Sequence, residues 1–514
     1  MKLATTQRKR TPMTEAIPQD VNLQDATLAF LGESPKKLLI NNEWVPAQDG
    51  STFETRNPAN GRVLAEVTQA GNGDVDAAVA AARHAFEAGP WGKMGGTERA
   101  ALLHRLGDLI LDHVDELAEL ETLDNGKPLR VSSRGDVPFA AKHLHYYAGW
   151  ADKLQGDTIP VSIPDKLVYT LRQPMGVVGL IIPWNFPLLM AAWKLGPALA
   201  AGNTTLLKPA EETPLTALRL GELIVEAGFP PGVVNILTGP GVPTGAAISQ
   251  HMGVDKISFT GSTEVGRRIM EASAGSNLKK ISLELGGKSP NVIFGDADLS
   301  SAIRGAHWAC FSTSGQECTA GSRLLVEESV YDQVAEGLIE QAEKLRVGSG
   351  FAPKVHVGPI VSERQLDRVL GYIDDGRENS AEMLTGGERL GGDLSDGYFL
   401  SPTIFAHDDD SLPLVQEEIF GPVLALTSFS DWDELIARAN STRYGLAAGV
   451  WTQDISKAHR FANAVQAGTV WVNCYGLYDA AAPFGGTKES GFGREMGEEA
   501  LDLYTQTKTV WIGL

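Results

Sequence analysis

Short β-branched runs alternate with helical stretches in the middle of this chain, between residues 176 and 285. The strand-like runs are GVVGLIIP, NTTLLKP, GVVNILTG, DKISFTG and KKISLEL, and the segments between them carry apolar residues at helical spacing. This alternation predicts a parallel, doubly wound sheet with helices on both faces. Ligands of such sheets bind at the carboxyl ends of the strands. The predicted fold class is therefore α/β, with the site at that edge of the sheet.

The chain is too long for one hydrophobic core, since 514 residues exceed what a single domain usually supports. We assign residues 37–150 and 174–286 to the domain of the doubly wound sheet, and residues 287–489 to a second α/β domain. A hairpin or a connection outside the main sheet is expected within 151–173. The C-terminal run DLYTQTKTVWIGL would be an exposed edge unless another strand or subunit covers it. Residues 1–36 are expected to form a flexible tail.

Charge and composition exclude several classes of function. The formal net charge of −20 argues against a nucleic-acid partner, which would need a basic surface. No apolar run is long enough to span a bilayer, so no membrane partner is expected. The three cysteines are too few for a disulfide framework, which fits a reducing compartment and predicts a cytoplasmic protein. Neither HExxH nor CxxC occurs, so no metal site is predicted.

Cys318 is the candidate nucleophile. It lies in FSTSGQECTAGSR, where nearly all neighbours are small or polar. A structural cysteine usually belongs to an apolar run, whereas a reactive thiol needs a partly polar, accessible setting. A Gly-, Ser- and Thr-rich loop can also bring backbone N–H groups close to a substrate. The alternative is a cysteine that only packs, which is the commoner case in large proteins.

Two further residues fit roles in acyl chemistry. Asn185 in PWNFP stands between aromatic residues at a strand end that two prolines make rigid, and a fixed amide suits a developing oxyanion. Glu284 in LELGGK ends an apolar strand, where a half-buried carboxyl could act as a general base with a raised pKa. The alternatives are an ordinary turn asparagine and the first polar residue after a strand.

Helix starts in the doubly wound region are candidate phosphate sites, because they present free N–H groups and the positive end of the helix dipole. In FTGSTEVGRR, Gly261 permits a tight turn and Ser262 can cap the helix and donate to a phosphate. Lys208 and Glu211 follow another strand, where they could hold two ribose hydroxyls. Because a carboxylate there repels a 2′-phosphate, NAD is preferred to NADP. Glycines used for packing and two surface charges are the alternative interpretation.

Seven of these stretches together resemble the NAD(P)-dependent aldehyde dehydrogenase superfamily. They are PWNFP, KPAEETPLTAL, FTGSTEVG, LELGGKSP, GQECTAGSR, EEIFGP and PFGGTKESGFGRE, in the family's order from Leu38 to the C-terminus. The resemblance implies a Rossmann-type cofactor domain, an α/β catalytic domain and a small β oligomerisation unit made of residues 151–173 and 495–514. It also implies a homotetramer or homodimer that oxidises a small-molecule aldehyde to the carboxylic acid with NAD.

The resemblance also implies a role for each matched residue. Cys318 would attack the aldehyde to give a thiohemiacetal, Asn185 would hold the oxyanion, and Glu284 would activate water against the thioester. Lys194 and Glu495 match a proton relay. The residues implied to bind the cofactor are Ile182, Pro183, Trp184, Lys208, Glu211, Gly241, Gly261, Ser262, Leu285, Gly286, Glu418 and Phe420.

Departures from the family pattern bear on the substrate. Thr313 and Ser312 replace an Asn and a frequent Phe, and Glu317 directly precedes the nucleophile. By position the substrate tunnel would be lined by Phe139, Phe186, Met190, Trp193, Glu317, Thr319, Tyr475, Tyr478 and Phe484. Such a wall suits an aliphatic or aromatic aldehyde, while Glu317 would suit an aminoaldehyde or betaine aldehyde. Plain core packing of the aromatic residues and an ion-paired surface Glu317 remain alternatives.

A semialdehyde is a further possible substrate, and a basic anchor in the tunnel would favour it. A non-catalytic protein on this scaffold is disfavoured because Cys318, Asn185 and Glu284 are all present.

Overall fold

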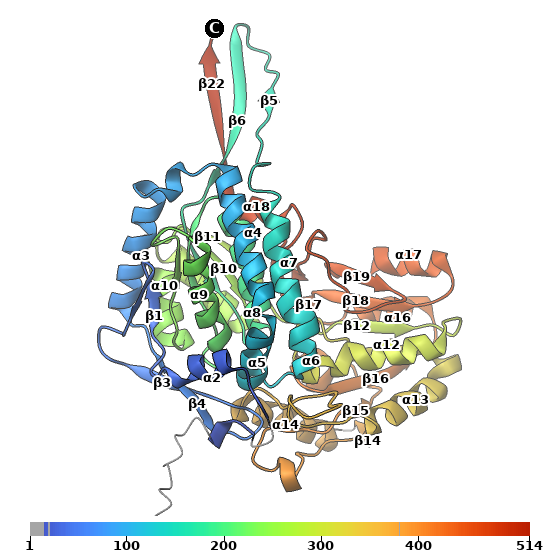
Figure 1. Ribbon diagram of the computed structural model, residues 1–514. Helices are drawn as coiled ribbons and strands as arrows, with labels where there is room; N and C mark the ends of the chain where they lie inside the picture. Colours follow the sequence, from blue (N-terminus) through green and yellow to red (C-terminus); the bar gives the residue numbers. More distant parts are fainter. Residues whose placement is uncertain (1–14, 19–20, 380) are drawn as a thin grey trace, which may run out of the picture.

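The first domain is built on an eight-stranded sheet of order β2-β1-β9-β8-β7-β10-β11-β21 (Figure 1). The strands β7 to β11 are parallel, and β1, β2 and β21 run antiparallel at the two edges. The computed structural model describes residues 15–18, 21–379 and 381–514. The strand bounds are β1 Leu38–Ile40, β2 Glu43–Val45, β7 Val177–Ile181, β8 Thr204–Lys208, β9 Val234–Ile236, β10 Lys256–Thr260, β11 Lys280–Glu284 and β21 Gly491–Phe492. The predicted doubly wound α/β sheet is confirmed.

Helices cover both faces of this sheet. One core joins α3 (Asn72–Glu87), α10 (Ala246–Gln250) and α11 (Thr263–Ala274) to one face. The other joins the second face to α4 (Gly96–Asp112), α5 (Val114–Asn125), α7 (Val137–Ala148), α8 (Pro187–Ala200) and α9 (Leu215–Ala227). In α3 the buried positions Val75, Ala78, Val79, Ala82 and Ala85 recur at helical spacing, so the sequence pattern predicts this helix correctly.

The second domain has a seven-stranded sheet of order β14-β15-β16-β13-β12-β18-β19, with only β14 antiparallel. Its strands are β12 Pro290–Ile293, β13 Arg323–Glu327, β14 Glu382–Thr385, β15 Thr403–Ala406, β16 Val423–Phe429, β18 Ala447–Trp451 and β19 Thr469–Val472. Helices α12 (Leu299–Phe311) and α13 (Tyr331–Glu343) pack on one face. The other face carries α14 (Glu363–Glu378), α16 (Trp432–Ala439) and α17 (Ile455–Ala464).

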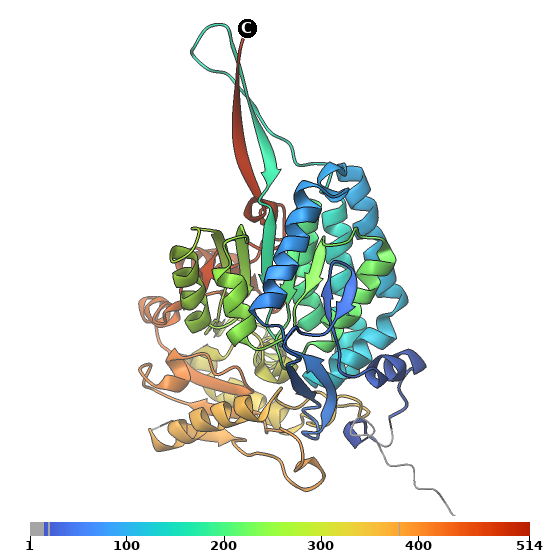
Figure 2. The same cartoon turned by 90° about the vertical axis from the view of Figure 1, so that its left-hand side faces the viewer.

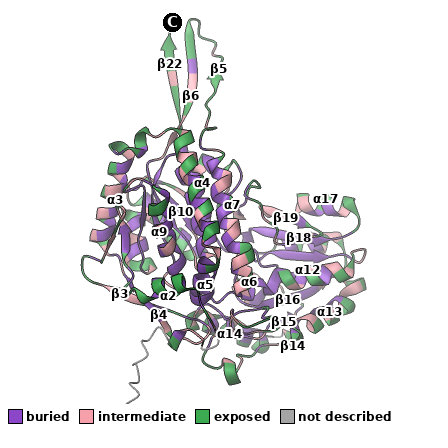
Figure 3. Ribbon diagram, viewed as in Figure 1, coloured by how far each residue is buried: buried purple, intermediate pink, exposed green. Residues whose placement is uncertain are grey.

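A three-stranded arm projects from the first domain (Figures 1 and 2). The C-terminal strand β22 (Thr505–Gly513) pairs along its whole length with β6 (Lys166–Pro174), which also pairs with β5 (Thr158–Ile159). The arm is mostly exposed (Figure 3), and its exposed side chains include Leu171, Trp511 and Ile512. The sequence correctly predicts a hairpin outside the main sheet, and β22 is its partner.

The N-terminal segment differs from the expected flexible tail. Helix α2 (Asp25–Gly32) buries Phe30 and Leu31. The side chain of Glu119 in α5 accepts hydrogen bonds from the backbone N–H of Gln24, at 3.0 Å, and from the hydroxyl of Thr27. The tail prediction is therefore wrong for residues 21–36, because an apolar face and a capping carboxylate hold them in place. Residues 1–14 and 19–20 lie outside the described part. Within the described residues, no helix is long and apolar enough to cross a membrane.

Candidate active site

A single cavity of about 1810 Å³ gathers the predicted site residues. It runs from the carboxyl ends of β7, β8, β10 and β11 to the segment that follows α12 and the loop after β19. Every predicted catalytic, cofactor and tunnel residue lines it except Lys194, which contacts the lining residue Glu495. Residues distant in the sequence thus line one cavity.

The backbone before Cys318 is tightly turned. Thr313, Ser314 and Gly315 all have positive φ, and a side chain at Gly315 would meet the carbonyl oxygen of Gly421 at 2.2 Å. The side chain of Gln316 accepts a hydrogen bond of 3.0 Å from the N–H of Val361. These contacts hold Cys318 partly exposed at the cavity wall, whereas Cys310 is buried away from it.

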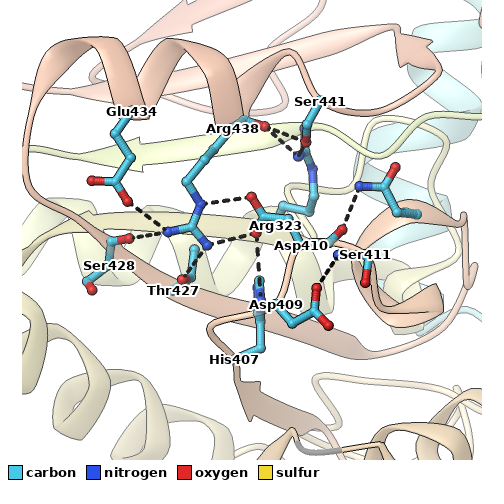
Figure 4. Close-up of polar contacts among 11 residues, drawn as sticks. Arg323, His407, Asp409, Asp410, Ser411, Thr427, Ser428, Glu434, Arg438 and Ser441 are labelled. Carbon is cyan, nitrogen blue, oxygen red and sulfur yellow. Dashed lines mark hydrogen bonds and ion pairs between the residues drawn. The ribbon is translucent and has the colours of Figure 1, made fainter.

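Arg323 fixes the other end of the nucleophile segment (Figure 4). Its guanidinium donates to the carbonyls of Lys288 at 3.0 Å, Arg438 at 3.0 Å and Ala439 at 2.8 Å. Arg438 in turn donates two hydrogen bonds of 2.7 and 2.8 Å to the carboxylate of Asp410. Charged hydrogen bonds of this kind are stronger than neutral ones, so the segment is held between β12 and α16.

Asn185 lies between the end of β7 and the start of α8, and its side-chain amide is buried. The amide Nδ2 donates to the carbonyl of Gln316 at 2.9 Å, two residues before the cysteine. One of its two N–H groups is therefore used to hold the amide against the nucleophile segment. The other N–H is the donor that an oxyanion beside Cys318 could use.

Glu284, at the end of β11, is buried in the cavity wall. Neither carboxyl oxygen has a hydrogen-bond partner among the described residues. Burial, reinforced by the negative charge of Glu495, raises the pKa of Glu284 well above its ordinary value. An unpaired buried carboxyl is costly, so it is a candidate for a functional group rather than a packing one.

Glu495 and Lys194 form a buried ion pair next to Glu284. The hydroxyl of Ser258 on β10 lies 3.0 Å from both Lys194 Nζ and Glu495 Oε1. Lys194 comes from α8 and Glu495 from the segment after β21, so the pair joins distant parts of the chain. The matched relay residues are thus in contact.

Cys318 has a raised thiol pKa. Burial is the main cause, and Glu418, Glu284 and Glu317 add to it because their negative charges disfavour a thiolate. The thiol is therefore protonated at neutral pH in this state, and it needs a base or a nearby positive charge to become nucleophilic.

The predicted nucleotide-binding residues line one part of the cavity. Ser262 caps α11 by accepting from the N–H of Val265 at 3.3 Å, so that helix N-terminus faces the cavity. Lys208 Nζ donates to the carbonyl of Pro209 at 2.9 Å and lies 3.8 Å from the carboxylate of Glu211, and both side chains line the cavity. The exposed side chains of Val242 and Val265 line the same groove and offer an apolar wall for a flat base.

The middle of the cavity is formed by Glu418 and Phe420. The Glu418 carboxylate accepts from the N–H of Gly287 at 3.0 Å, and burial raises its pKa to about 7. A side chain at Gly286 would meet this carboxylate at 2.2 Å, so only glycine lets it approach. The Phe420 ring stands edge-on to Trp184, with ring centroids 5.1 Å apart. The remaining predicted cofactor residues on the lining are Ile182, Pro183, Gly241, Gly261 and Leu285.

Aromatic side chains crowd the opposite end. Phe484 lies 5.4 Å from Trp193 and 5.6 Å from Tyr478 between ring centroids. The Tyr478 hydroxyl is 2.6 Å from the hydroxyl of Thr319. Phe139, Phe186, Met190 and Tyr475 complete this wall. The tunnel positions therefore line the cavity, although most of them also pack into a core.

Glu317 also points to this end of the cavity. Ser312 donates a hydrogen bond of 2.9 Å to its carboxylate, and burial raises its pKa. The alternative of an ion-paired surface glutamate is not supported, since Glu317 lines the cavity and forms no ion pair in the described part of the chain.

Sequence reasoning missed several lining residues. The exposed apolar side chains of Trp308 and Leu477 lie here, together with the charged Arg134, Asp136 and Lys142. Trp308 is on the outer side of α12, and a large apolar residue at an otherwise exposed helix position is the one signal that points to it. The charged residues follow no pattern that distinguishes them from surface charges. No cluster that could hold a metal ion occurs among residues 15–18, 21–379 and 381–514.

A doubly wound sheet with a large cavity at the carboxyl ends of its strands is typical of nucleotide-binding enzymes. The model of the aldehyde dehydrogenase family matches residues 44–510. The chain belongs to the aldehyde dehydrogenase family, and it is an enzyme that acts on the aldehyde group.

Known relatives cover nearly the whole chain. Human mitochondrial aldehyde dehydrogenase is 52% identical over 93% of this chain and 92% of its own length. The NAD⁺ complex of Bacillus cereus aldehyde dehydrogenase has a TM-score of 0.94 at 51% identity, over 96% of this chain and 99% of that one. A betaine aldehyde dehydrogenase from Staphylococcus aureus has a TM-score of 0.93 at 40% identity, over 95% and 97%.

Proposed function

We propose that this protein oxidises an aldehyde to the carboxylic acid with NAD, through a covalent intermediate on Cys318. The observation that carries the proposal is the cavity wall itself. It presents a partly exposed thiol, an amide at the same segment and a buried carboxyl without a hydrogen-bond partner among the described residues. These are the three groups that acyl transfer followed by hydrolysis requires.

In the first half of the reaction, the Cys318 thiol loses its proton to water, the thiolate attacks the aldehyde carbon, and the carbonyl oxygen becomes an oxyanion. The free N–H of Asn185 and the backbone N–H of Cys318 stabilise this charge. Bound NAD supplies a positive ring that favours the thiolate and a carbon that accepts the hydride. The carbon that loses the hydride becomes a thioester of Cys318.

In the second half, Glu284 takes a proton from water as the water oxygen attacks the thioester carbonyl. The C–S bond then breaks, which releases the acid and restores the sulfur of Cys318. A carboxyl with a raised pKa suits this task, because its carboxylate form accepts a proton from water more readily than an ordinary carboxylate does. A family member that transferred the acyl group to a thiol cofactor would have no need of this base.

The residues at the nucleotide end support NAD as the cofactor. Lys208 and Glu211 match two adjacent ribose hydroxyls, and the negative charge of Glu211 disfavours a 2′-phosphate. The Bacillus cereus relative was solved as an NAD⁺ complex. We therefore expect NAD to be preferred to NADP.

The direct test is NADH formation from a panel of aldehydes with either NAD or NADP. The panel contains a short aliphatic aldehyde, phenylacetaldehyde, betaine aldehyde, aminobutyraldehyde and succinic semialdehyde. We expect activity with the aliphatic and aromatic compounds, and a higher kcat/KM with NAD. Absence of turnover on the whole panel, together with measurable NAD binding, would contradict the proposal.

A cationic aldehyde is the second candidate substrate. The Glu317 carboxylate and the rings of Tyr475 and Tyr478 line the same end of the cavity, and a cation can lie over such rings. The betaine aldehyde dehydrogenase relative makes this class relevant.

Glu317→Gln separates the two substrate classes. If the carboxylate holds a cation, this change lowers kcat/KM for aminobutyraldehyde by about tenfold and leaves that for a neutral aldehyde of equal length within about twofold. Thr313→Ser, in the same segment, is the matched control. Equal effects of Glu317→Gln on both aldehydes would exclude the cationic class.

The arm supports assembly into a homodimer or homotetramer. Strand β22 is an edge strand, and its exposed Trp511 and Ile512 leave apolar surface in water. We expect light scattering to give the mass of a dimer or tetramer, and Trp511→Glu to shift it toward the monomer while Gln506→Glu does not. A monomeric wild-type chain would contradict this assignment.

A reducing location fits the proposed chemistry. All three cysteines are free thiols, and the reaction consumes the thiol form of Cys318 in each turnover. We therefore assign the enzyme to the cytoplasm.

A further inference from the structure

We propose that the proton taken up by Glu284 leaves the active site along one polar face of β10 and β11, and that Lys256 receives it at the far end. This inference rests on the proposed function, because it concerns the hydrolytic half of that reaction. It assigns Lys256 as a positioning residue that acts through the groups contacting Glu284, not as one that touches the substrate.

The register of the two strands creates this polar face. Lys256 pairs with Lys280, Ser258 with Ser282, and Thr260 with Glu284. Side chains opposite one another in a parallel pair point to the same side of the sheet. Six polar side chains therefore form two adjacent rows that run from the cavity, at Glu284, to the opposite end of the strands.

The neighbouring positions are apolar, so the polar rows are a local exception. On β7, Val178 is in register with Lys256 and Leu180 with Ser258, and both belong to the hydrophobic core. The alternate residues of β10, Ile257 and Phe259, pack into the core on the other face. Packing alone would favour aliphatic side chains in the polar rows as well, since burying polar groups costs free energy.

Two separate sets of hydrogen bonds involve residues of the rows. At the cavity end, Ser258 Oγ lies 3.0 Å from Glu495 and 3.0 Å from Lys194. At the far end, Lys256 Nζ donates to Ser282 Oγ at 2.8 Å. The hydroxyl of Thr260 is buried without a partner among the described residues, which leaves hydrogen-bonding capacity beside Glu284.

Lys256 is a buried amine without a counter-ion. The described residues provide no carboxylate within ion-pair distance, and its ammonium group lies 5.2 Å from the centre of the Tyr504 ring. The charged groups that face it are Lys194 from α8, Glu495 from the segment after β21 and Lys280 from β11. Burial, together with the two lysines, lowers the pKa of Lys256 to about 7. The amine can therefore gain and lose a proton in the working range of pH.

One side chain at the far end of the rows reaches water. Lys280, the partner of Lys256, is exposed at the start of β11. Tyr504 stands at the base of the arm, where its carbonyl accepts from Asn203 at 2.9 Å. Lys256 itself is buried, and its exposed register partner Lys280 marks the place where this end of the rows meets solvent, away from the cavity.

The protons balance in the hydrolysis of the thioester. Attack of water on the thioester transfers one proton to the Glu284 carboxylate, and the C–S bond then breaks to give the thiolate of Cys318 and the carboxylic acid, so that proton stays on the protein. Glu284 returns to the carboxylate when the proton passes through Glu495, Lys194 and Ser258 to the neutral amine of Lys256. Lys256 then releases it to solvent, so no other reactant is needed.

Lys256→Met is the test, because methionine keeps the length and removes the proton acceptor. In rapid mixing of the variant with NAD and an aldehyde, we expect the first turnover to form NADH at a rate within about twofold of wild type. Steady-state turnover should fall about tenfold or more, since general acid–base steps contribute factors of this size and above. The solvent deuterium isotope effect on turnover should rise, and the inflection of kcat near pH 7 should disappear.

Lys279→Met is the matched control, since Lys279 is a buried lysine of the same domain whose amine donates elsewhere, to the carbonyl of Ser249 and the hydroxyl of Ser276. It should keep the wild-type pH profile. Ser282→Ala, which removes only the partner of Lys256, should slow turnover in the same direction and serves if Lys256→Met does not fold.

The outcomes separate the two proposals. Wild-type turnover and an unchanged pH profile in both Lys256→Met and Ser282→Ala would overturn the relay and leave the proposed function intact. Loss of the first NADH turnover in Lys256→Met, with a melting temperature lowered as much as in the control, would assign Lys256 a structural role instead. A wild-type enzyme without a Cys318-dependent first turnover would refute the proposed function itself.

Discussion

Cys318→Ala is expected to abolish NADH formation from every aldehyde in the panel, with a loss of at least about 10⁴-fold in kcat/KM. The covalent bond to the aldehyde carbon is what makes hydride departure possible, and no other thiol can replace it. Cys310 is buried, and Cys474 does not line the cavity. The measurement is steady-state NADH absorbance, together with mass spectrometry of enzyme quenched during turnover.

Cys474→Ala is the control for this change, because it removes a partly exposed thiol outside the cavity. It should keep wild-type kinetics and show the acyl adduct on Cys318. Cys318→Ala should still bind NAD, since the cofactor end of the cavity lies on other elements. Measurable aldehyde oxidation by Cys318→Ala, or an adduct on another residue, would refute the mechanism.

The local pattern of apolar residues in the sequence predicts most of the fold. The doubly wound sheet follows from strand runs whose residues are buried on both faces, such as β7, and from helices whose apolar residues recur at helical spacing, such as α3. Helix α2 escaped prediction because the side chain of Glu119, remote in the sequence, supplies the hydrogen bonds at its start. Sequence periodicity contains no information on such a contact.

The site was predictable to the extent that each residue had a chemical reason or a family match at its own position. The thiol of Cys318 and the carboxyl of Glu284 could be proposed from their neighbours in the sequence. Trp308 and Asp136 could not, because their place on the cavity depends on how α12 and the segment before α7 pack. The place of Lys256 could not be predicted either, because its polar row forms only when β10 and β11 pair in register.

Glu284→Gln should separate the two halves of the reaction. The first turnover should still produce about one NADH per subunit, because formation of the thioester does not require this carboxyl. Hydrolysis should then slow by about 10²- to 10⁴-fold, the usual contribution of a general base. Rapid mixing with absorbance detection resolves the burst from the steady rate, and the acyl adduct on Cys318 should accumulate.

The pH dependence of the hydrolysis rate is an independent test of the same variant. Glu284 must be a carboxylate to accept the proton, and its pKa is raised, so wild-type hydrolysis should decline as pH falls through that raised pKa. The steady rate of Glu284→Gln should show no such decline. A variant with wild-type hydrolysis, or one that loses the burst as well as the steady rate, would contradict the assignment of Glu284 as the base.

The stability of Glu284→Gln should not fall below that of wild type. Unfolding would then be excluded as the cause of its lost turnover. The folded chain keeps a proton on Glu284 that the unfolded chain releases above about pH 4.5, so this group makes stability fall as pH rises from that value through the raised pKa. Glutamine needs no proton, and it removes that penalty. The melting temperature of Glu284→Gln at pH 8 should therefore equal or exceed that of wild type, while turnover is lost. A lower melting temperature would show that the carboxylate is paired in solution, and the base would then have to be sought elsewhere on the cavity wall.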